Sequence, residues 1–90
     1  MVKYSDEPLD AVFAALADPT RRQVVKLLAS GSRPVSELAR PFPMSLPGFM
    51  KHLLILEDAG LIKREKEGRV VSCTLTAEPM KKAPIIHSQL

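Results

Sequence analysis

The sequence predicts one small, mainly helical domain that ends in a β-hairpin. Through residues 9–60, apolar residues recur at the three- and four-residue spacing of amphipathic helices. In residues 61–76 the spacing changes to two, which is typical of half-buried strands. The chain has 90 residues, of which 46% are hydrophobic. A chain of this size forms one core, so residues 1–90 are predicted to be a single domain.

Residues 44–60 carry the clearest helix signal, because both ends of the helix are marked. Ser45 is a preferred N-cap, and Pro47 falls in the first turn, where a missing N–H is tolerated. Gly60 supplies the left-handed residue that often ends a helix. A helical wheel places four apolar residues on one face, which is expected to be buried: Leu46, Phe49, Leu53 and Leu56.

The opposite face of this helix, formed by Pro47, Gly48 and Lys51, is expected to be presented to a partner. Small residues allow a close approach to another surface, and Lys51 adds a positive charge. The face begins at a helix N-terminus, where the backbone N–H groups favour anions. Nucleic acid is the partner that this presented face fits best.

Three more helices are predicted before this one. A repeat of apolar residues predicts a first helix over about residues 9–17; its members are Leu9, Val12, Phe13 and Leu16. Asp18 as N-cap and Pro19 at the first helical position start a second helix over about residues 19–29. This helix is expected to bury Val24, Val25, Leu27 and Leu28 and to expose Arg21, Arg22 and Lys26. A short third helix follows at about residues 35–40.

The third helix is separated from the N-cap at Ser45 by only a short turn. Two helices joined in this way, the second with a presented face, form a helix-turn-helix, here over about residues 35–59. The second helix would then be the recognition helix.

A hairpin follows the recognition helix directly. Strand-like runs at residues 61–65 and 69–76 flank the loop Lys66-Glu67-Gly68, whose glycine tolerates positive φ. The predicted fold is therefore mainly α with a two-stranded antiparallel wing, a winged helix-turn-helix with the wing at about residues 61–76. It has about five helices if one begins near Thr76, leaving an atypical C-terminal tail at residues 77–90.

The charge of the chain is unevenly distributed. Residues 1–20 carry one basic and four acidic residues, a net charge of −3, whereas residues 21–90 carry twelve basic and six acidic residues, a net charge of +6. The positive part contains the presented face and the wing, which suits a polyanionic partner. The same charges would also serve to solvate helix faces, so charge alone does not decide the function.

Several classes of function are not expected. Cys73 is the only cysteine, so no internal disulfide is possible, and the hydrophobic side of its strand makes it a core thiol. The N-terminus lacks a signal peptide, and the longest apolar run, residues 11–17, is too short to cross a bilayer. We therefore expect a cytoplasmic protein that does not bind or cross a membrane. No nucleophile with a neighbouring base, glycine-rich phosphate loop or carboxylate pair is recognisable, so we expect no enzyme.

Six motifs in this order resemble the ArsR-type winged helix-turn-helix transcriptional regulators over about residues 9–80. They are Leu16-Ala-Asp-Pro-Thr-Arg-Arg22, Val35-Ser-Glu-Leu-Ala39, Met44-Ser-Leu-Pro47, Lys51-His-Leu53, Leu56-Glu-Asp-Ala-Gly-Leu61 and Glu67-Gly-Arg69. The resemblance implies a bacterial or archaeal homodimeric repressor that binds an operator in double-stranded DNA near its own gene. It also implies that the helix beginning at Ser45 enters the major groove and that Arg69 lies in the wing.

Three features depart from the family pattern. Met50 stands where a serine commonly precedes the Lys-His pair, and Gly48 stands where alanine is usual. Glycine costs roughly 0.5 to 1 kcal/mol of helix stability but allows a closer approach. The family's long C-terminal helix, which pairs across the dimer, is interrupted here by Pro84. Either the dimer then depends on the first helix, or the tail is a replaced or truncated end.

Neither a metal nor another cofactor is expected. Metal-sensing relatives carry a cysteine pair in the third helix, and residues 36–40 contain no cysteine. His52 and His87 are far apart in sequence, and no carboxylate cluster accompanies either of them. Aromatic residues are scarce, so the sequence predicts no small-molecule pocket.

These observations predict a DNA-binding site. Five residues are expected in the major groove: Ser45, Leu46, Pro47, Gly48 and Lys51. His52 at their flank either reaches a phosphate or packs as a structural histidine. Backbone N–H groups near Ser36 would hold a phosphate, and Lys66 and Arg69 would follow the DNA backbone. The alternative is a winged-helix module that binds another protein, for which Met50 at the edge of the presented face is the favouring residue.

Overall fold

The computed structural model describes residues 3–76, and side chains from residue 9 on. It contains four helices and three strands in these residues. They are α1 (Lys3–Leu16), α2 (Pro19–Leu28), β1 (Arg33–Pro34), α3 (Val35–Ala39), α4 (Leu46–Asp58), β2 (Ile62–Glu67) and β3 (Val70–Leu75). The expected fifth helix, from near Thr76 on, and the tail at residues 77–90 lie outside the described residues. The first helix also begins earlier than expected, at Lys3 instead of near Leu9.

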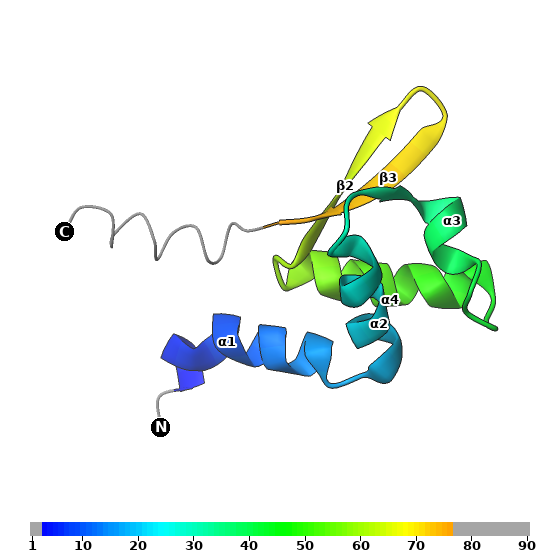
Figure 1. Ribbon diagram of the computed structural model, residues 1–90. Helices are drawn as coiled ribbons and strands as arrows, with labels where there is room; N and C mark the ends of the chain where they lie inside the picture. The colour runs from blue at the N-terminus through cyan, green and yellow to red at the C-terminus, as the bar shows by residue number, and fades with distance from the viewer. Residues whose placement is uncertain (1–2, 77–90) are drawn as a thin grey trace.

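The helix α4 lies in the middle of the domain and contacts α1, α2 and β2 (Figure 1). Each of these elements contributes side chains to one apolar core, whose members are Ala15, Val24, Leu28, Leu38, Phe49, Leu53, Leu56, Ile62 and Cys73. The predicted burial of Cys73 is confirmed. In the described part of the chain, no helix is long and apolar enough to span a bilayer.

The predicted ends of α4 are confirmed in atomic detail. The Ser45 side chain accepts a hydrogen bond from the Gly48 N–H, which makes it the N-cap. At the other end the Gly60 N–H donates to the Glu57 carbonyl and the Leu61 N–H to the Leu56 carbonyl, at 2.9 and 3.0 Å. These two bonds, with Gly60 at a φ of 78°, form a Schellman motif that satisfies the last carbonyls of the helix.

The buried face of α4 is confirmed except at its first residue. Phe49, Leu53 and Leu56 are fully buried, whereas Leu46 is 55% exposed. Leu46 is in the first turn, which extends past the edge of the core, so the helical period alone assigned it wrongly. The exposed position agrees with the other role predicted for Leu46, that of a surface residue facing a partner.

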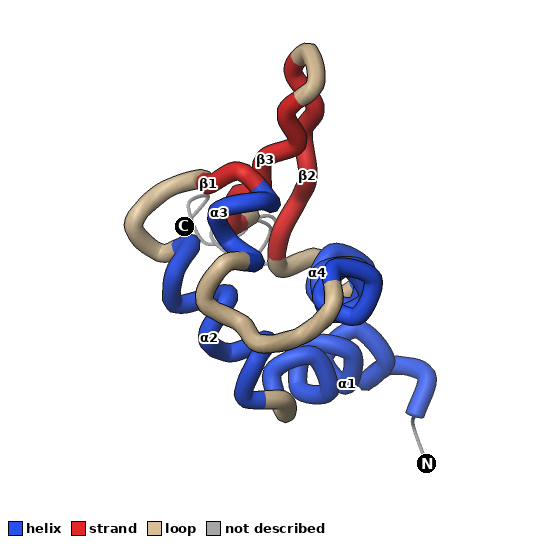
Figure 2. Tube along the Cα trace, turned by 90° about the vertical axis from the view of Figure 1, so that its right-hand side faces the viewer, coloured by secondary structure: helices blue, strands red, loops and turns tan. Residues whose placement is uncertain are grey.

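The sheet has one strand more than expected. Its order is β1-β3-β2, and β1 pairs antiparallel with β3 through Arg33 and Pro34. The hairpin of β2 and β3, including its turn, is called the wing from here on. Its turn consists of Gly68 and Arg69, because Glu67 pairs with Val70. Lys66 and Glu67 are thus strand residues and not loop residues. The wing projects beyond the helices in both views (Figures 1 and 2).

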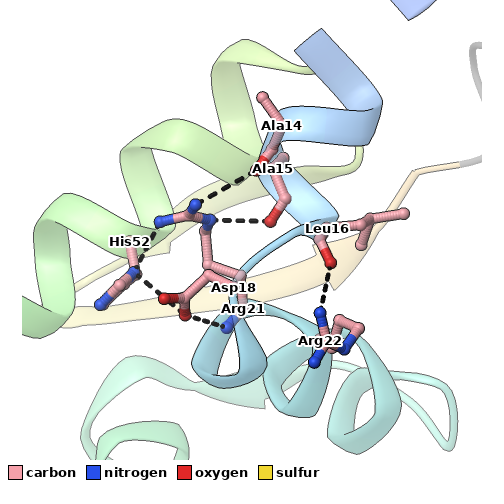
Figure 3. Close-up of polar contacts among 7 residues, drawn as sticks. All are labelled: Ala14, Ala15, Leu16, Asp18, Arg21, Arg22 and His52. Carbon is pink, nitrogen blue, oxygen red and sulfur yellow. Dashed lines mark hydrogen bonds and ion pairs between the residues drawn. The ribbon is translucent and has the colours of Figure 1, made fainter. Parts of the chain in front are cut away.

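Three arginines bind the C-terminal carbonyls of helices. Arg21 donates to the Ala15 carbonyl at 2.7 Å and to the Ala14 carbonyl at 3.2 Å, and Arg22 donates to the Leu16 carbonyl at 2.8 Å (Figure 3). In the same way, Arg33 donates to a carbonyl at the end of α2. The guanidinium groups donate to carbonyls in the last turns of the helices and offset the negative end of the helix dipole. The expectation that Arg21 is simply exposed is therefore wrong, since its side chain holds α1 against α2.

Candidate nucleic-acid interface

The first turn of α4 exposes the residues expected in the major groove. Ser45, Leu46, Pro47 and Lys51 are exposed, and Gly48 is half-buried. The Ser45 oxygen accepts a bond from the backbone, so its hydroxyl hydrogen is left for an outside acceptor. A helix N-terminus followed one turn later by an exposed lysine combines hydrogen-bond donors with positive charge. This arrangement suits base edges and phosphates alike.

The presence of glycine at position 48 has a structural reason in addition to the close approach of the helix to a partner. A Cβ built at this position would lie 3.2 Å from the Ser45 Oγ, which is the oxygen that caps the helix. Alanine at this position would therefore press against the cap. The usual advantage of alanine over glycine in a helix is offset here by crowding of the Ser45 side chain.

The wing carries the two cations that were expected along the DNA backbone. Lys66 is exposed in β2, and Arg69 is exposed in the turn. Gly68 precedes Arg69 with a φ of 62°, a left-handed conformation that tightens the turn. Within the described residues, neither side chain has an ion pair or a hydrogen bond, unlike Lys63, which lies 3.5 Å from Glu65. Their charge is therefore available to a partner.

The start of α3 places Ser36 on the same side of the domain as the wing. The N-cap of α3 is Pro34, which provides no side-chain acceptor for the first N–H groups of this helix. Ser36, Leu46 and Arg69 all line one groove, together with Met50. The structure thus brings α3, the first turns of α4 and the tip of the wing together.

This groove, called the wing groove, corrects the expectation of no pocket. Its volume is about 360 Å³. Its lining residues are Pro34, Val35, Ser36, Leu46, Met50, Arg64, Arg69, Val70 and Val71. The residues come from five elements and the turn of the wing, so no local pattern in the sequence indicates the groove. Met50 is half-buried in its wall, where it packs against the core.

His52 lies apart from this group. Its Nδ1 is 2.9 Å from the Arg21 guanidinium and 3.8 Å from an Asp18 carboxylate oxygen, at the junction of α1, α2 and α4 (Figure 3). A guanidinium only donates, so Nδ1 accepts and the ring hydrogen is on Nε2. This geometry gives His52 the structural role, one of the two left open by its sequence. A contact of Nε2 with DNA stays a prediction.

Two titratable groups are shifted by these surroundings. The N–H of Arg21 donates a hydrogen bond to the Asp18 carboxylate, which lowers the pKa of Asp18 below its ordinary value of 3.8. Burial raises the pKa of the Cys73 thiol, which keeps the sulfur protonated and unreactive. Among the described side chains, those of residues 9–76, no three from His, Cys, Asp or Glu are grouped in a way that would hold a metal ion.

The sequence analysis missed two exposed apolar residues on α4. Leu54 and Ile55 are 44% and 41% exposed. On α1, Leu9 and Phe13 are exposed one turn apart, so they share one face of the helix. The helical repeat of the sequence included this pair, and their exposure agrees with the expectation that the dimer depends on the first helix.

A helix-turn-helix followed by a projecting wing, with cations and small residues on one side, defines a winged helix-turn-helix transcriptional regulator. The family model described as a helix-turn-helix domain matches residues 16–65. The transcriptional repressor SdpR of Bacillus subtilis (strain 168) is 34% identical over 67 residues, which are 74% of either chain. The crystal structure of an ArsR family transcriptional regulator, RHA00566, is 48% identical with a TM-score of 0.79, over 99% of this chain and 93% of that one. The chain belongs to the ArsR family.

A third relative bears on assembly. The homodimeric winged helix-turn-helix DNA-binding domain of Mb0332 from Mycobacterium bovis, a possible ArsR-family regulator, is 27% identical with a TM-score of 0.75. The match covers 91% of this chain and 76% of that one.

Proposed function

We propose that this protein is a homodimeric, autoregulating repressor that acts in the cytoplasm on an operator in double-stranded DNA. The exposed first turns of α4 beside the projecting wing carry the proposal. Ser45, Leu46, Pro47, Gly48 and Lys51 enter the major groove and contact base edges. Repression follows because the bound dimer occludes a promoter.

The DNA backbone is held on either side of α4. The N–H groups at the start of α3, near Ser36, bind one phosphate, and Lys66 and Arg69 bind the backbone beside the wing. The groove that Ser36 shares with Leu46 and Arg69 supports one continuous DNA path over these elements. Backbone contacts fix the register of the protein, and α4 reads the sequence.

The dimer forms through α1. Phe13 is 63% exposed and Leu9 is 54% exposed on the same face, an apolar pair that a second copy of the chain would cover. The homodimeric Mb0332 domain supports a dimer, whereas the choice of α1 rests on the exposed pair. Two recognition helices in one dimer would read two half-sites of a palindromic operator.

A protein partner is the second candidate, and the exposure of Leu46 favours it. An apolar side chain in the middle of the proposed contact surface is also what a protein interface uses as an anchor. Major-groove contacts use apolar residues too, at thymine methyl groups, so Leu46 fits both candidates. The same binding experiment separates them.

The test is fluorescence anisotropy of the full chain with DNA from upstream of its own gene and with a scrambled duplex, each at low and at moderate salt. We expect tighter binding to the upstream DNA by about 10³ or more at moderate salt, with two chains per site. Equal, weak binding to both duplexes that disappears as salt rises would show charge attraction alone. That outcome would contradict the repressor and leave the protein partner.

A further inference from the structure

The wing groove is more apolar than a path for the DNA backbone requires. Six of its nine lining residues are apolar, and two of these, Leu46 and Val70, are 55% and 50% exposed. Phosphates and sugars gain no hydrogen bonds from such walls, and water against them is unfavourable. The volume of about 360 Å³ is in the range of sites that bind small molecules.

The polar groups of the groove are two arginines and a serine. The Arg64 Nε donates to a Glu57 carboxylate oxygen at 2.9 Å, and this pair offsets the Arg64 charge. Arg69, which also lines the groove, has no such partner among the described residues, so its full charge and its N–H donors are available to a ligand there. A planar guanidinium binds a carboxylate through two parallel hydrogen bonds.

We infer that the wing groove binds a small amphipathic carboxylate that acts as an effector. Its hydrocarbon part lies against Leu46, Met50 and Val70, and its carboxylate pairs with Arg69. The effector role rests on the proposed function, because Leu46 and Arg69 are also the proposed DNA contacts. Ligand and DNA would then exclude one another, with no conformational change needed.

Binding is tested on the free domain, without DNA. The ¹⁵N-labelled full chain is titrated with octanoate and separately with octan-1-ol, which has the same chain length and no charge. We expect saturable amide shifts confined to the residues that line the groove, and an affinity for octanoate about tenfold above that for octan-1-ol. Shifts spread over Leu9, Phe13 and Leu54 as well would show general adhesion to apolar surface and overturn the proposal. Equal affinities for the two probes would overturn it too.

Two kinds of variant locate the probe. Arg69→Gln is expected to lower octanoate affinity about tenfold and to leave octan-1-ol binding unchanged. Lys26→Gln removes the same charge from α2, which does not line the groove, and should change neither. Val70→Trp, at an exposed strand position, should fill the groove and abolish the binding of both probes. Retained binding in a Val70→Trp chain with a native amide spectrum would overturn the placement.

Competition tests the effector role. With octanoate at ten times its own Kd, the apparent affinity for upstream DNA should fall about tenfold if the two exclude one another. Unchanged DNA affinity with octanoate bound would overturn the effector role. Failure of the repressor proposal itself is seen separately, as equal binding to upstream and scrambled DNA without octanoate, and the titration of the free domain is unaffected by it.

Discussion

The Arg21 guanidinium donates to His52 Nδ1 at 2.9 Å and so joins the end of α1 to the middle of the recognition helix. The same side chain binds two carbonyls at the end of α1. One residue of α2 thus fixes how the two other helices lie against each other (Figure 3). The position of α4 relative to α1 is set by this contact as well as by the apolar core.

Arg21→Ala should destabilise the domain. It removes three hydrogen bonds of a partly buried charged group and leaves His52 Nδ1 and the Ala15 carbonyl without these partners, a loss of about 2–3 kcal/mol in the free energy of unfolding. Urea denaturation followed by circular dichroism measures it. Arg22→Ala removes one exposed bond and is the matched control, with an expected loss within about 0.5 kcal/mol. Equal losses in the two variants would contradict the role of Arg21.

Asp18 should make stability depend on pH in the acidic range. Its pKa is lowered in the folded state, chiefly by the hydrogen bond from the Arg21 N–H, so its contribution is fully present above pH 3.8. The contribution is lost as pH falls from there through the lower folded pKa. Asp18→Asn keeps an acceptor for the cap without the charge. Its melting temperature should differ from that of the unmodified chain near neutral pH, and the difference should shrink below pH 3.8. A constant difference would contradict this.

Lys51 should contribute to the choice of base. If it contacts a guanine, Lys51→Ala should weaken operator binding by about 1–3 kcal/mol and relax the preference at one base pair. Anisotropy with duplexes that differ at single positions measures both effects. Lys26→Ala, which removes an exposed lysine of α2, is the control for net charge. Unchanged affinity and preference would remove Lys51 from the interface.

Arg69 should contribute to the affinity for DNA but not to the preference for particular base pairs. Arg69→Gln should weaken binding by a similar factor on every duplex and lower the slope of log K against log salt by about one unit, because one phosphate contact is lost. Binding measured at several salt concentrations gives the slope. An effect at one base pair only, with an unchanged slope, would place Arg69 on a base and not on the backbone.

Phe13 should be needed for the dimer. Phe13→Asp places a charge at the centre of the exposed apolar pair on α1, and we expect sedimentation of a monomer where the unmodified chain sediments as a dimer. Operator affinity should fall with it, because one chain reads only one half-site. Leu54→Asp, at an exposed apolar position of α4, should leave the dimer intact. A dimer that persists in Phe13→Asp would place the interface elsewhere.

Features determined by nearby residues could be predicted from the sequence. Both ends of α4 follow from Ser45 and Gly60, because capping depends on the residues within one turn of each end. The strand period likewise identified the buried side of β3 at Cys73. The recognition helix and the wing, which together carry the proposed DNA contacts, follow from these local signals.

Features that depend on residues far apart in the sequence could not be predicted. Arg21 and His52 are 31 positions apart, and no local pattern shows that their side chains meet. The strand β1 consists of Arg33 and Pro34 alone, too short for a period to appear and with a proline that lowers strand propensity. The exposure of Leu46 depends on where the core ends, which is a property of the whole fold.

The arginines that bind helix carbonyls also determine which amino-acid substitutions this sequence tolerates. Exchange of arginine for lysine keeps net charge and is often treated as conservative. At Arg21 it is not, because an ammonium group on a flexible chain does not span two carbonyls and an imidazole at once. At Lys51 the reverse exchange keeps a cation on the surface. Two variants with equal charge and equal identity to this chain would thus differ in stability, according to which cation had changed.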